Sequence, residues 1–201
     1  MPFGLTNAPS TFQATMNEML RSFLQKIVLV FLDDILIYIN DWQDHLQHVK
    51  QVLQTLRENG FVAKRSKYTF GQEAVEYLRH VVSRDGLAVG PTKVFAIRAW
   101  LIPTNVRGVR GFLGLAGYYR KFIRSFTTIA APLSDLLRQW EKFTWTAEMR
   151  RAFEELEECL CTTPVLSLPD FSKEFIVETD ASSVGIEAVL HQGRHLIAFY
   201  S

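Results

Sequence analysis

The stretch Lys26-Ile-Val-Leu-Val-Phe-Leu-Asp-Asp-Ile-Leu-Ile-Tyr-Ile39 holds two adjacent carboxylates, Asp33 and Asp34, inside a run of apolar residues. The Val, Ile, Leu, Phe and Tyr residues on either side favour β-strand. Asp is depleted from strands but common in tight turns. The pattern therefore predicts a hairpin, with a strand over residues 27–32, a turn at Asp33-Asp34 and a strand over residues 35–39.

The paired carboxylates pose an electrostatic problem. At a separation of about 4 Å they repel each other by roughly 4 kcal/mol at an effective dielectric of about 20. The apolar neighbours add a desolvation cost to both charges. Carboxylate oxygens at one tip suit Mg²⁺ or Mn²⁺, and two such ions about 3.5–4 Å apart would serve an in-line phosphoryl displacement. On the dipeptide alone, a surface hairpin whose Asp-Asp turn is simply solvated remains an open alternative.

Composition places the chain among ordinary globular proteins. Of its 201 residues 48% are hydrophobic, enough for one large domain or two small ones. No apolar run is long enough for a membrane-spanning helix, and no basic and apolar leader precedes Met1. Cys159 and Cys161 are too close together for a good disulfide and lack the companions of a zinc site. We therefore expect a reduced, intracellular setting and no membrane partner.

Charge is unevenly distributed along the chain. Residues 86–134 contain no Asp or Glu, but they carry Lys93, Arg98, Arg107, Arg110, Arg120, Lys121 and Arg124. A basic segment of this kind is the electrostatic footprint of a nucleic-acid backbone contact, although a solvated helical face is the alternative. The rings of Tyr118, Tyr119 and Phe122 lie among these cations, which suits stacking and sugar–phosphate contact. The same rings could instead pack in a helical core, and both readings can hold together.

The remaining pattern predicts a mixture of helices and antiparallel strands. A first helix is expected with Pro9 in its first turn and Met16 in its apolar stripe, and further helices up to about residue 59 and over residues 92–100, 104–122, 127–139 and 147–160. The buried face of the helix that ends near residue 59 is expected to comprise Leu46, Val49, Leu53 and Leu56. Strands are expected over residues 61–68, 175–179, 184–190 and 195–200, and residues 75–83 with the turn Arg84-Asp-Gly86 are expected to form one more hairpin. Four glycines three residues apart, from Gly108 to Gly117, predict a small-residue ridge that another backbone could approach closely.

Several motifs together resemble one enzyme family. Phe31-Leu-Asp-Asp34 is similar to the aromatic-x-Asp-Asp box of reverse transcriptases, and Met1-Pro-Phe-Gly-Leu-Thr-Asn-Ala-Pro-Ser-Thr-Phe-Gln13 resembles the motif that leads into their palm helix. The similarity continues through Tyr77-Leu-Arg-His-Val-Val-Ser83, Arg110-Gly-Phe-Leu-Gly-Leu-Ala-Gly-Tyr-Tyr-Arg-Lys-Phe122, Pro164-Val-Leu-Ser-Leu-Pro-Asp-Phe-Ser-Lys173 and Glu178-Thr-Asp-Ala-Ser182. In sequence and in order these motifs resemble those of the Pol polyprotein of gypsy-type LTR retrotransposons, and among these they are most similar to the plant members.

The resemblance implies an α+β fold in three parts. Residues 1–86 would be the C-terminal part of the reverse transcriptase palm, built from a helix and antiparallel hairpins. Residues 87–141 would be the helices of the thumb and connection, and residues 142–201 the N-terminal part of a ribonuclease H-like α/β domain. The implied partners are an RNA/DNA template–primer duplex, a deoxynucleoside triphosphate (dNTP) and the remainder of the Pol polyprotein.

The resemblance also implies roles for residues at the polymerase site. Asp33 would be the principal ligand of the catalytic Mg²⁺ or Mn²⁺, and Asp34 a supporting carboxylate. Phe3 and Gly4 would line the nucleotide pocket.

Further roles fall on later parts of the chain. The primer grip would comprise Leu78, Arg79 and His80, where Arg79 replaces the usual Gly and would be strained if the turn needs a positive φ. The resemblance assigns the first metal-binding carboxylate of the ribonuclease H-like domain to Asp180. A Glu, Glu187, stands nearby where Gly is usual. The basic residues expected at the nucleic-acid backbone are Arg107, Arg110, Arg120, Lys121 and Arg124.

Both implied active sites are partial in this sequence. A polymerase of this type needs a third metal-binding Asp on a strand before the Met1 motif, and the ribonuclease site needs several carboxylates besides Asp180. We therefore expect the isolated 201-residue chain to have little or no activity. Three possibilities remain: an enzyme segment that is active in its whole polyprotein, a non-catalytic nucleic-acid-binding module, and an inert remnant of a decayed element.

Overall fold

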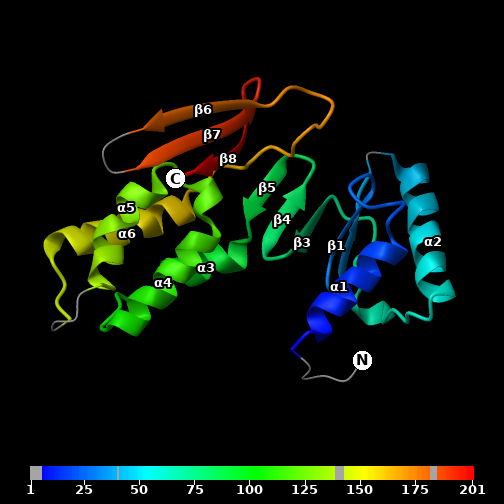
Figure 1. Cartoon of the computed structure of the whole chain (residues 1–201), viewed down its shortest axis with the longest axis horizontal. Coiled ribbons are helices and arrows are strands. Elements are labelled where there is room, and N and C mark those ends of the chain that lie inside the picture. Colours follow the sequence, from blue (N-terminus) through cyan, green and yellow to red (C-terminus); the bar gives the residue numbers. More distant parts are fainter. Residues whose placement is uncertain (1–5, 40, 139–142, 182–184) are drawn as a thin grey trace. The chain divides into compact units, whose positions relative to one another are not determined.

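The computed structural model describes residues 6–39, 41–138, 143–181 and 185–201. The chain divides into two compact units, an N-terminal unit (Met1–Gln72) and a C-terminal unit (Glu73–Ser201), and each is described by itself (Figure 1). Both combine helices with antiparallel sheet, as the sequence predicts. Among the described residues no helix is both long and apolar enough to cross a membrane.

The N-terminal unit packs two helices against one hairpin. Its elements in order are α1 (Ala8–Met19), β1 (Val28–Phe31), β2 (Asp34–Ile37), α2 (Trp42–Glu58) and the short 3-10 helix η1 (Arg65–Lys67). Pro9 lies in the first turn of α1, where its missing N–H costs nothing, and the Asp41 carboxylate caps α2 by accepting hydrogen bonds from two backbone N–H groups. The small core comprises Met16, Leu20, Val28, Val52 and Leu56.

Two predictions for this unit are wrong in whole or in part. On the predicted buried face of α2 only Leu56 is buried, Val49 is half-buried, and Leu46 and Leu53 are 48% and 36% exposed; Val52, which was not predicted, is buried. Residues 61–68 pair with no strand and form only the 3-10 helix η1. Apolar spacing predicted the helix but did not identify which side chains meet the core.

The C-terminal unit contains two three-stranded antiparallel sheets and a group of helices. The first sheet has the order β3 (Ala74–Tyr77), β4 (His80–Ser83), β5 (Gly86–Val89), and the second has the order β6 (Ile176–Ala181), β7 (Ile186–Gln192), β8 (His195–Tyr200). Between the sheets along the chain lie α3 (Pro91–Arg98), α4 (Val106–Tyr118), the 3-10 helix η2 (Arg120–Phe122), α5 (Phe126–Leu136) and α6 (Ala147–Cys161).

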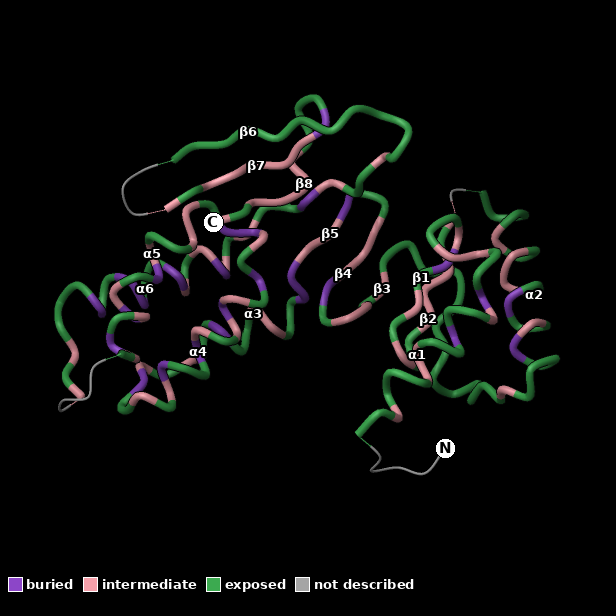
Figure 2. Tube along the Cα trace, viewed as in Figure 1, coloured by how far each residue is buried: buried purple, intermediate pink, exposed green. Residues whose placement is uncertain are grey.

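The core of this unit lies among its helices. Phe112 of α4 and Phe153 of α6 contact each other with ring centroids 4.4 Å apart, and Leu133 of α5 is fully buried in the same cluster. Figure 2 shows this buried cluster on the helices, whereas strand β6 is exposed along its whole length. Cys159 and Cys161 near the end of α6 are both free thiols, as the sequence predicts.

The glycine ridge of α4 faces open space. A Cβ added to Gly114 or Gly117 would meet no described atom within 4 Å, and one added to Gly111 would only touch Trp100. Gly108 alone is needed for close packing, against Pro103. The described chain therefore leaves most of this ridge uncovered.

Gly86 is the glycine on which the C-terminal unit depends most. Its φ is +136°, and a Cβ there would collide with the carbonyl oxygen of Leu166. At the same place the Leu87 N–H donates to the Leu166 carbonyl at 2.7 Å, and the Leu166 N–H donates to the Leu87 carbonyl at 2.9 Å. These bonds tie the first sheet to the segment that leads into the second sheet.

We expect Gly86→Ala to lower the free energy of unfolding of the C-terminal unit by at least about 2 kcal/mol, because backbone strain and overpacking add. The matched control is Gly114→Ala, which should raise that free energy by up to about 1 kcal/mol, since Ala is the better helix former and the space is open. Urea denaturation followed by circular dichroism measures both. An unchanged midpoint for Gly86→Ala would show that the bridge to Leu166 is dispensable.

Candidate functional site

The carboxylate pair lies at the tip of the β1–β2 hairpin. In the observed register Phe31 pairs with Asp34, so the turn residues are Leu32 and Asp33, and Asp34 is the first residue of β2. The predicted hairpin is present, but its turn lies one residue earlier than the sequence pattern suggested. Both carboxylates are exposed, and Leu32 adopts a left-handed φ of +52°.

A side chain from α1 holds this turn. The Leu32 N–H donates to Oε1 of Gln13 at 2.6 Å, and Nε2 of Gln13 donates to the Val30 carbonyl at 3.3 Å and to Oδ1 of Asn17 at 2.8 Å. The Gln13 side chain therefore binds the backbone of Val30 and of Leu32, just before Asp33. The sequence analysis quoted Gln13 only as the end of a motif. The sequence feature that could have indicated this role is an amide side chain next to the apolar stripe of α1.

The pair suits part of a divalent-cation site. In the part of the chain that the structure describes, the side-chain carboxylates of Asp33 and Asp34 form no hydrogen bond or ion pair, and no group of three or more His, Cys, Asp or Glu side chains could hold a metal ion. Magnesium is commonly bound through one or two carboxylates, with water and substrate phosphate completing its shell. The donor set fits such an ion but supplies only part of its ligands. Phe3 and Gly4 lie outside the described residues.

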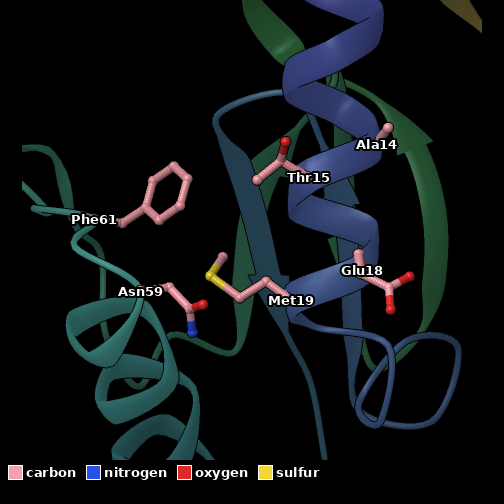
Figure 3. Close-up of a pocket in the computed structure, with 6 residues that line it drawn as sticks. All are labelled: Ala14, Thr15, Glu18, Met19, Asn59 and Phe61. Carbon is pink, nitrogen blue, oxygen red and sulfur yellow. The ribbon is translucent and has the colours of Figure 1, made fainter.

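A hollow of about 470 Å³ lies elsewhere in the N-terminal unit, between α1 and the end of α2 (Figure 3). Its lining residues are Ala14, Thr15, Glu18, Met19, Asn59 and Phe61. The hollow contains one carboxylate and does not include Asp33 or Asp34. It therefore offers no evident chemistry of its own.

The β3–β4 turn is strained at both of its central residues. Tyr77 pairs with His80, so the two-residue loop is Leu78-Arg79, with φ of +49° and +65°. Positive φ at both positions is the type I′ geometry, which usually selects Asn or Gly. Left-handed backbone costs a residue with a Cβ roughly 1–2 kcal/mol. Arg79 has the positive φ at which a residue other than glycine was expected to be strained.

His80 lies buried beneath this turn. Its Nδ1 is 2.8 Å from the Leu78 carbonyl, and because a carbonyl only accepts, Nδ1 carries the proton and Nε2 does not. Nε2 is buried and has no hydrogen-bond partner among the described residues. Burial and the nearby Lys121 ammonium lower the pKa of His80 below its ordinary value, so the imidazole is neutral at neutral pH.

The predicted backbone-contact residues fall into two groups. Arg107, Arg110 and Arg124 are exposed, and their guanidinium groups form no hydrogen bond or ion pair with any other described residue. Arg120 donates from Nη2 to the Ser201 carbonyl at 3.0 Å and lies 5.2 Å from the Tyr200 ring centroid. Lys121 is half-buried over the Phe122 ring, and burial lowers the pKa of its ammonium. The second group is thus engaged within the chain.

The aromatic residues near these cations divide in the same way. Tyr119 and Phe122 are fully buried, which favours the core reading for both rings. Tyr118 is 44% exposed and remains accessible on α4.

Asp180 lies on β6 directly opposite Glu187 on β7. Asp180 is exposed, while Oε2 of Glu187 accepts a hydrogen bond from Oγ of Ser125 at 2.8 Å. Both carboxylates line a hollow of about 270 Å³ together with Thr127 and Thr128. Glu187, which stands where Gly was expected, therefore has a partner of its own.

Comparison with known proteins identifies two regions of the chain. Residues 1–82 match the family model of reverse transcriptase (RNA-dependent DNA polymerase). Residues 145–201 match that of the RNase H-like domain found in reverse transcriptase. Asp33, Asp34 and the Leu78–His80 turn fall in the first region, and Asp180 falls in the second.

Similar curated proteins are Pol polyproteins of transposons. The chain is 43% identical to the retrovirus-related Pol polyprotein from transposon 297 of Drosophila melanogaster, over 100% of this chain and 19% of that protein. It is 40% identical to the polyprotein from transposon gypsy of the same organism, over 96% and 20% respectively. It is 35% identical to the transposon Tf2-3 polyprotein of Schizosaccharomyces pombe, over 96% and 14%. The chain thus spans about a fifth or less of these relatives.

Solved structures show the same fold. The foamy viral protease-reverse transcriptase in complex with an RNA/DNA hybrid matches 99% of this chain and 27% of its own, with a TM-score of 0.89 and 24% identity. A second structure of that protein, with double-stranded DNA, matches 99% of this chain and 36% of its own, with a TM-score of 0.90 and 24% identity. The chain is therefore a segment of a retrotransposon Pol polyprotein that carries reverse transcriptase sequence followed by an RNase H-like domain.

Proposed function

We propose that this chain contributes Asp33 and Asp34 to the nucleotidyl-transfer site of an RNA-directed DNA polymerase. The observation that carries the proposal is the pair of exposed carboxylates on a hairpin tip that Gln13 holds in place, inside the reverse transcriptase region. In the reaction, the primer 3′-hydroxyl oxygen bonds to the α-phosphorus of a dNTP while the bond to pyrophosphate breaks. Bound Mg²⁺ or Mn²⁺ would stabilise the charge that develops on the phosphate oxygens. Asp33 is the principal ligand in this proposal and Asp34 the supporting one.

The same proposal assigns the other binding roles. Phe3 and Gly4 line the nucleotide pocket, and Leu78, Arg79 and His80 form the primer grip that holds the growing 3′ end. Asp180 provides the first metal-binding carboxylate of the ribonuclease H-like domain. These assignments rest on the resemblance of the motifs, as do the domain limits at residues 86 and 141 and the placement nearest to plant gypsy-type elements. The partners are the template–primer duplex, dNTP and the rest of the Pol polyprotein, in the cytoplasm (particle-associated) or the nucleus.

One face of α4 suits a nucleic-acid backbone. Its exposed positions include Arg107, Arg110, Gly111, Gly114 and Tyr118, which recur at spacings of three and four residues. Unpaired guanidinium groups supply positive charge, and the glycines let a sugar–phosphate chain approach closely. Because Arg120 and Lys121 are engaged within the chain, we assign the larger share of this contact to Arg107, Arg110 and Arg124.

A non-catalytic nucleic-acid-binding role is the second candidate. The observation that favours it is that the described residues group only two carboxylates at the hairpin tip. The two functions make different predictions for the same variants.

The first prediction concerns Asp33. We expect the 201-residue chain alone to give no detectable primer extension on poly(rA)–oligo(dT) with Mg²⁺ or Mn²⁺. The transposon 297 polyprotein with the corresponding segment replaced by this chain should extend the primer. In that chimera Asp33→Asn should lower kcat by at least about a hundredfold, because one ligand of the metal-ion site is lost. Asp44→Asn, which neutralises an exposed carboxylate on α2, should have no effect.

Two results would contradict this account. Extension by the isolated chain that Asp33→Asn abolishes would show that no further carboxylate is needed. A folded chimera that binds duplex but never extends a primer would favour the non-catalytic candidate.

The second prediction concerns Gln13. Gln13→Ala should leave the Leu32 N–H without its partner, which costs about 1–2 kcal/mol, so the Leu32 amide should exchange with solvent roughly ten times faster or more. Hydrogen exchange followed by nuclear magnetic resonance (NMR) measures this rate. Gln54→Ala is the matched control, because its Nε2 bonds only the Glu58 carboxylate on the surface of α2. Equal exchange of Leu32 in both variants would remove Gln13 from the site.

The third prediction concerns α4. Arg107→Gln combined with Arg110→Gln should weaken binding of an RNA/DNA hybrid about tenfold and reduce the slope of log affinity against log salt concentration by about 2. Arg150→Gln combined with Arg151→Gln removes the same charge from α6 and should change the affinity little. Fluorescence anisotropy at several salt concentrations measures both. Equal losses in the two double variants would show a general charge effect instead of a site on α4.

A further inference from the structure

Two adjacent tyrosines at the end of α4 reach the tip of the β3–β4 hairpin. The Tyr118 hydroxyl donates to the Leu78 carbonyl at 2.7 Å, and the Tyr119 hydroxyl donates to the Arg79 carbonyl at 3.1 Å. Each bond spans 40 residues of sequence. The acceptors are the carbonyls of the two residues whose φ is positive.

These bonds select the strained backbone conformation. A two-residue loop of Leu and Arg has no glycine to make positive φ inexpensive, so the hairpin alone would favour another turn. In the structure the carbonyls of Leu78 and Arg79 accept from the two phenols while both residues are left-handed. The Nδ1–H of His80 also donates to the Leu78 carbonyl and adds a third bond to the same turn.

The two tyrosines are themselves held in place differently. Tyr119 is fully buried and packs against His80 with ring centroids 5.5 Å apart, and burial raises the pKa of its phenol, which therefore remains a donor. Tyr118 is partly exposed, and the Arg79 guanidinium carbon lies 6.0 Å from its ring centroid. Tyr119 therefore anchors the turn to the core, and Tyr118 links the turn to the surface.

We propose that Tyr118 and Tyr119 are positioning residues that hold the Leu78–Arg79 turn in its left-handed form, so that Arg79 can meet a phosphate at the 3′ end of a primer strand. Tyr118 lies on the same exposed face of α4 as Arg107 and Arg110, so the turn extends the cationic surface of that helix. This inference rests on the proposed function of the turn as a primer grip. The tyrosines touch the turn and act through it.

The test removes only the hydroxyl groups. Tyr118→Phe and Tyr119→Phe, singly and together, keep both rings, and Tyr68→Phe in the N-terminal unit is the control. NMR of the 201-residue chain reports the backbone conformation and amide exchange of residues 78–80 without nucleic acid. An RNA/DNA hybrid with 4-thiothymidine at the primer 3′ end reports, by photocrosslinking and mass spectrometry, whether that end lies at residues 74–83.

In the double variant we expect the positive-φ chemical shifts of Leu78 and Arg79 to disappear and exchange of the nearby amides to rise about tenfold. Crosslinking to residues 74–83 should fall about fivefold or more, and this loss should exceed any loss of overall hybrid affinity, since Arg107 and Arg110 are intact. Adding Arg79→Gly to the double variant should restore the turn, because glycine adopts this φ without strain.

Each other outcome decides a specific part of the inference. If the double variant keeps the chemical shifts of the turn, the tyrosines do not hold it and the inference is overturned. If the turn is lost but crosslinking persists, the hydrogen bonds are structural only and the positioning role is rejected. If the wild-type chain binds no hybrid, the proposed function fails, and the NMR result still decides whether the tyrosines hold the turn.

Discussion

Backbone strain at two hairpin tips, relieved by side chains from distant helices, is the constraint on which both candidate sites depend. Leu32 beside the carboxylate pair and Leu78-Arg79 in the β3–β4 turn all have positive φ without being glycine. Left to themselves these turns would relax, because each such residue costs roughly 1–2 kcal/mol. The Gln13 amide bonds the backbone of the first turn, and the tyrosine hydroxyls of α4 bond that of the second. Strain of this kind tends to collect where a protein must fix a geometry.

This arrangement leaves the functional side chains uncommitted. Because side chains from the helices satisfy the backbone of both turns, the carboxylates of Asp33 and Asp34 keep all their lone pairs for a ligand. The Arg79 guanidinium lies over the Tyr118 ring and forms no hydrogen bond or ion pair with any described residue, so its N–H donors remain available. By contrast, Arg120 already donates a hydrogen bond to the Ser201 carbonyl, so it is a less suitable residue for binding phosphate. Free donors and acceptors, more than charge alone, distinguish the residues suited to bind a ligand (Asp33, Asp34 and Arg79) from Arg120.

The sequence predicted the elements well because their patterns are local. The hairpin around Asp33, the α6 helix and strand β8 follow from periodicity and turn residues within a few positions. The incorrect predictions depend instead on contacts between distant segments. They are the one-residue shift of the first turn, the part of the buried face of α2 formed by Val52 instead of Leu46 and Leu53, and the strand expected at 61–68. Gln13 was missed because its hydrogen bonds join residues 17 and 19 positions away, and no periodicity signals them. Pairing across the fold has to be seen before such roles can be assigned.

The structure also shows how the two expected departures from the family pattern are accommodated. At Arg79, where the resemblance leads us to expect Gly, the backbone carbonyl accepts a hydrogen bond from the Tyr119 hydroxyl, and the guanidinium lies over the Tyr118 ring. At Glu187, where Gly was also expected, the carboxylate accepts a hydrogen bond from the Ser125 hydroxyl. The two positions differ in what remains unsatisfied. The carboxylate of Glu187 has a hydrogen-bond partner, whereas Arg79 keeps its positive φ and therefore its backbone strain, which the hydrogen bonds to the turn must offset.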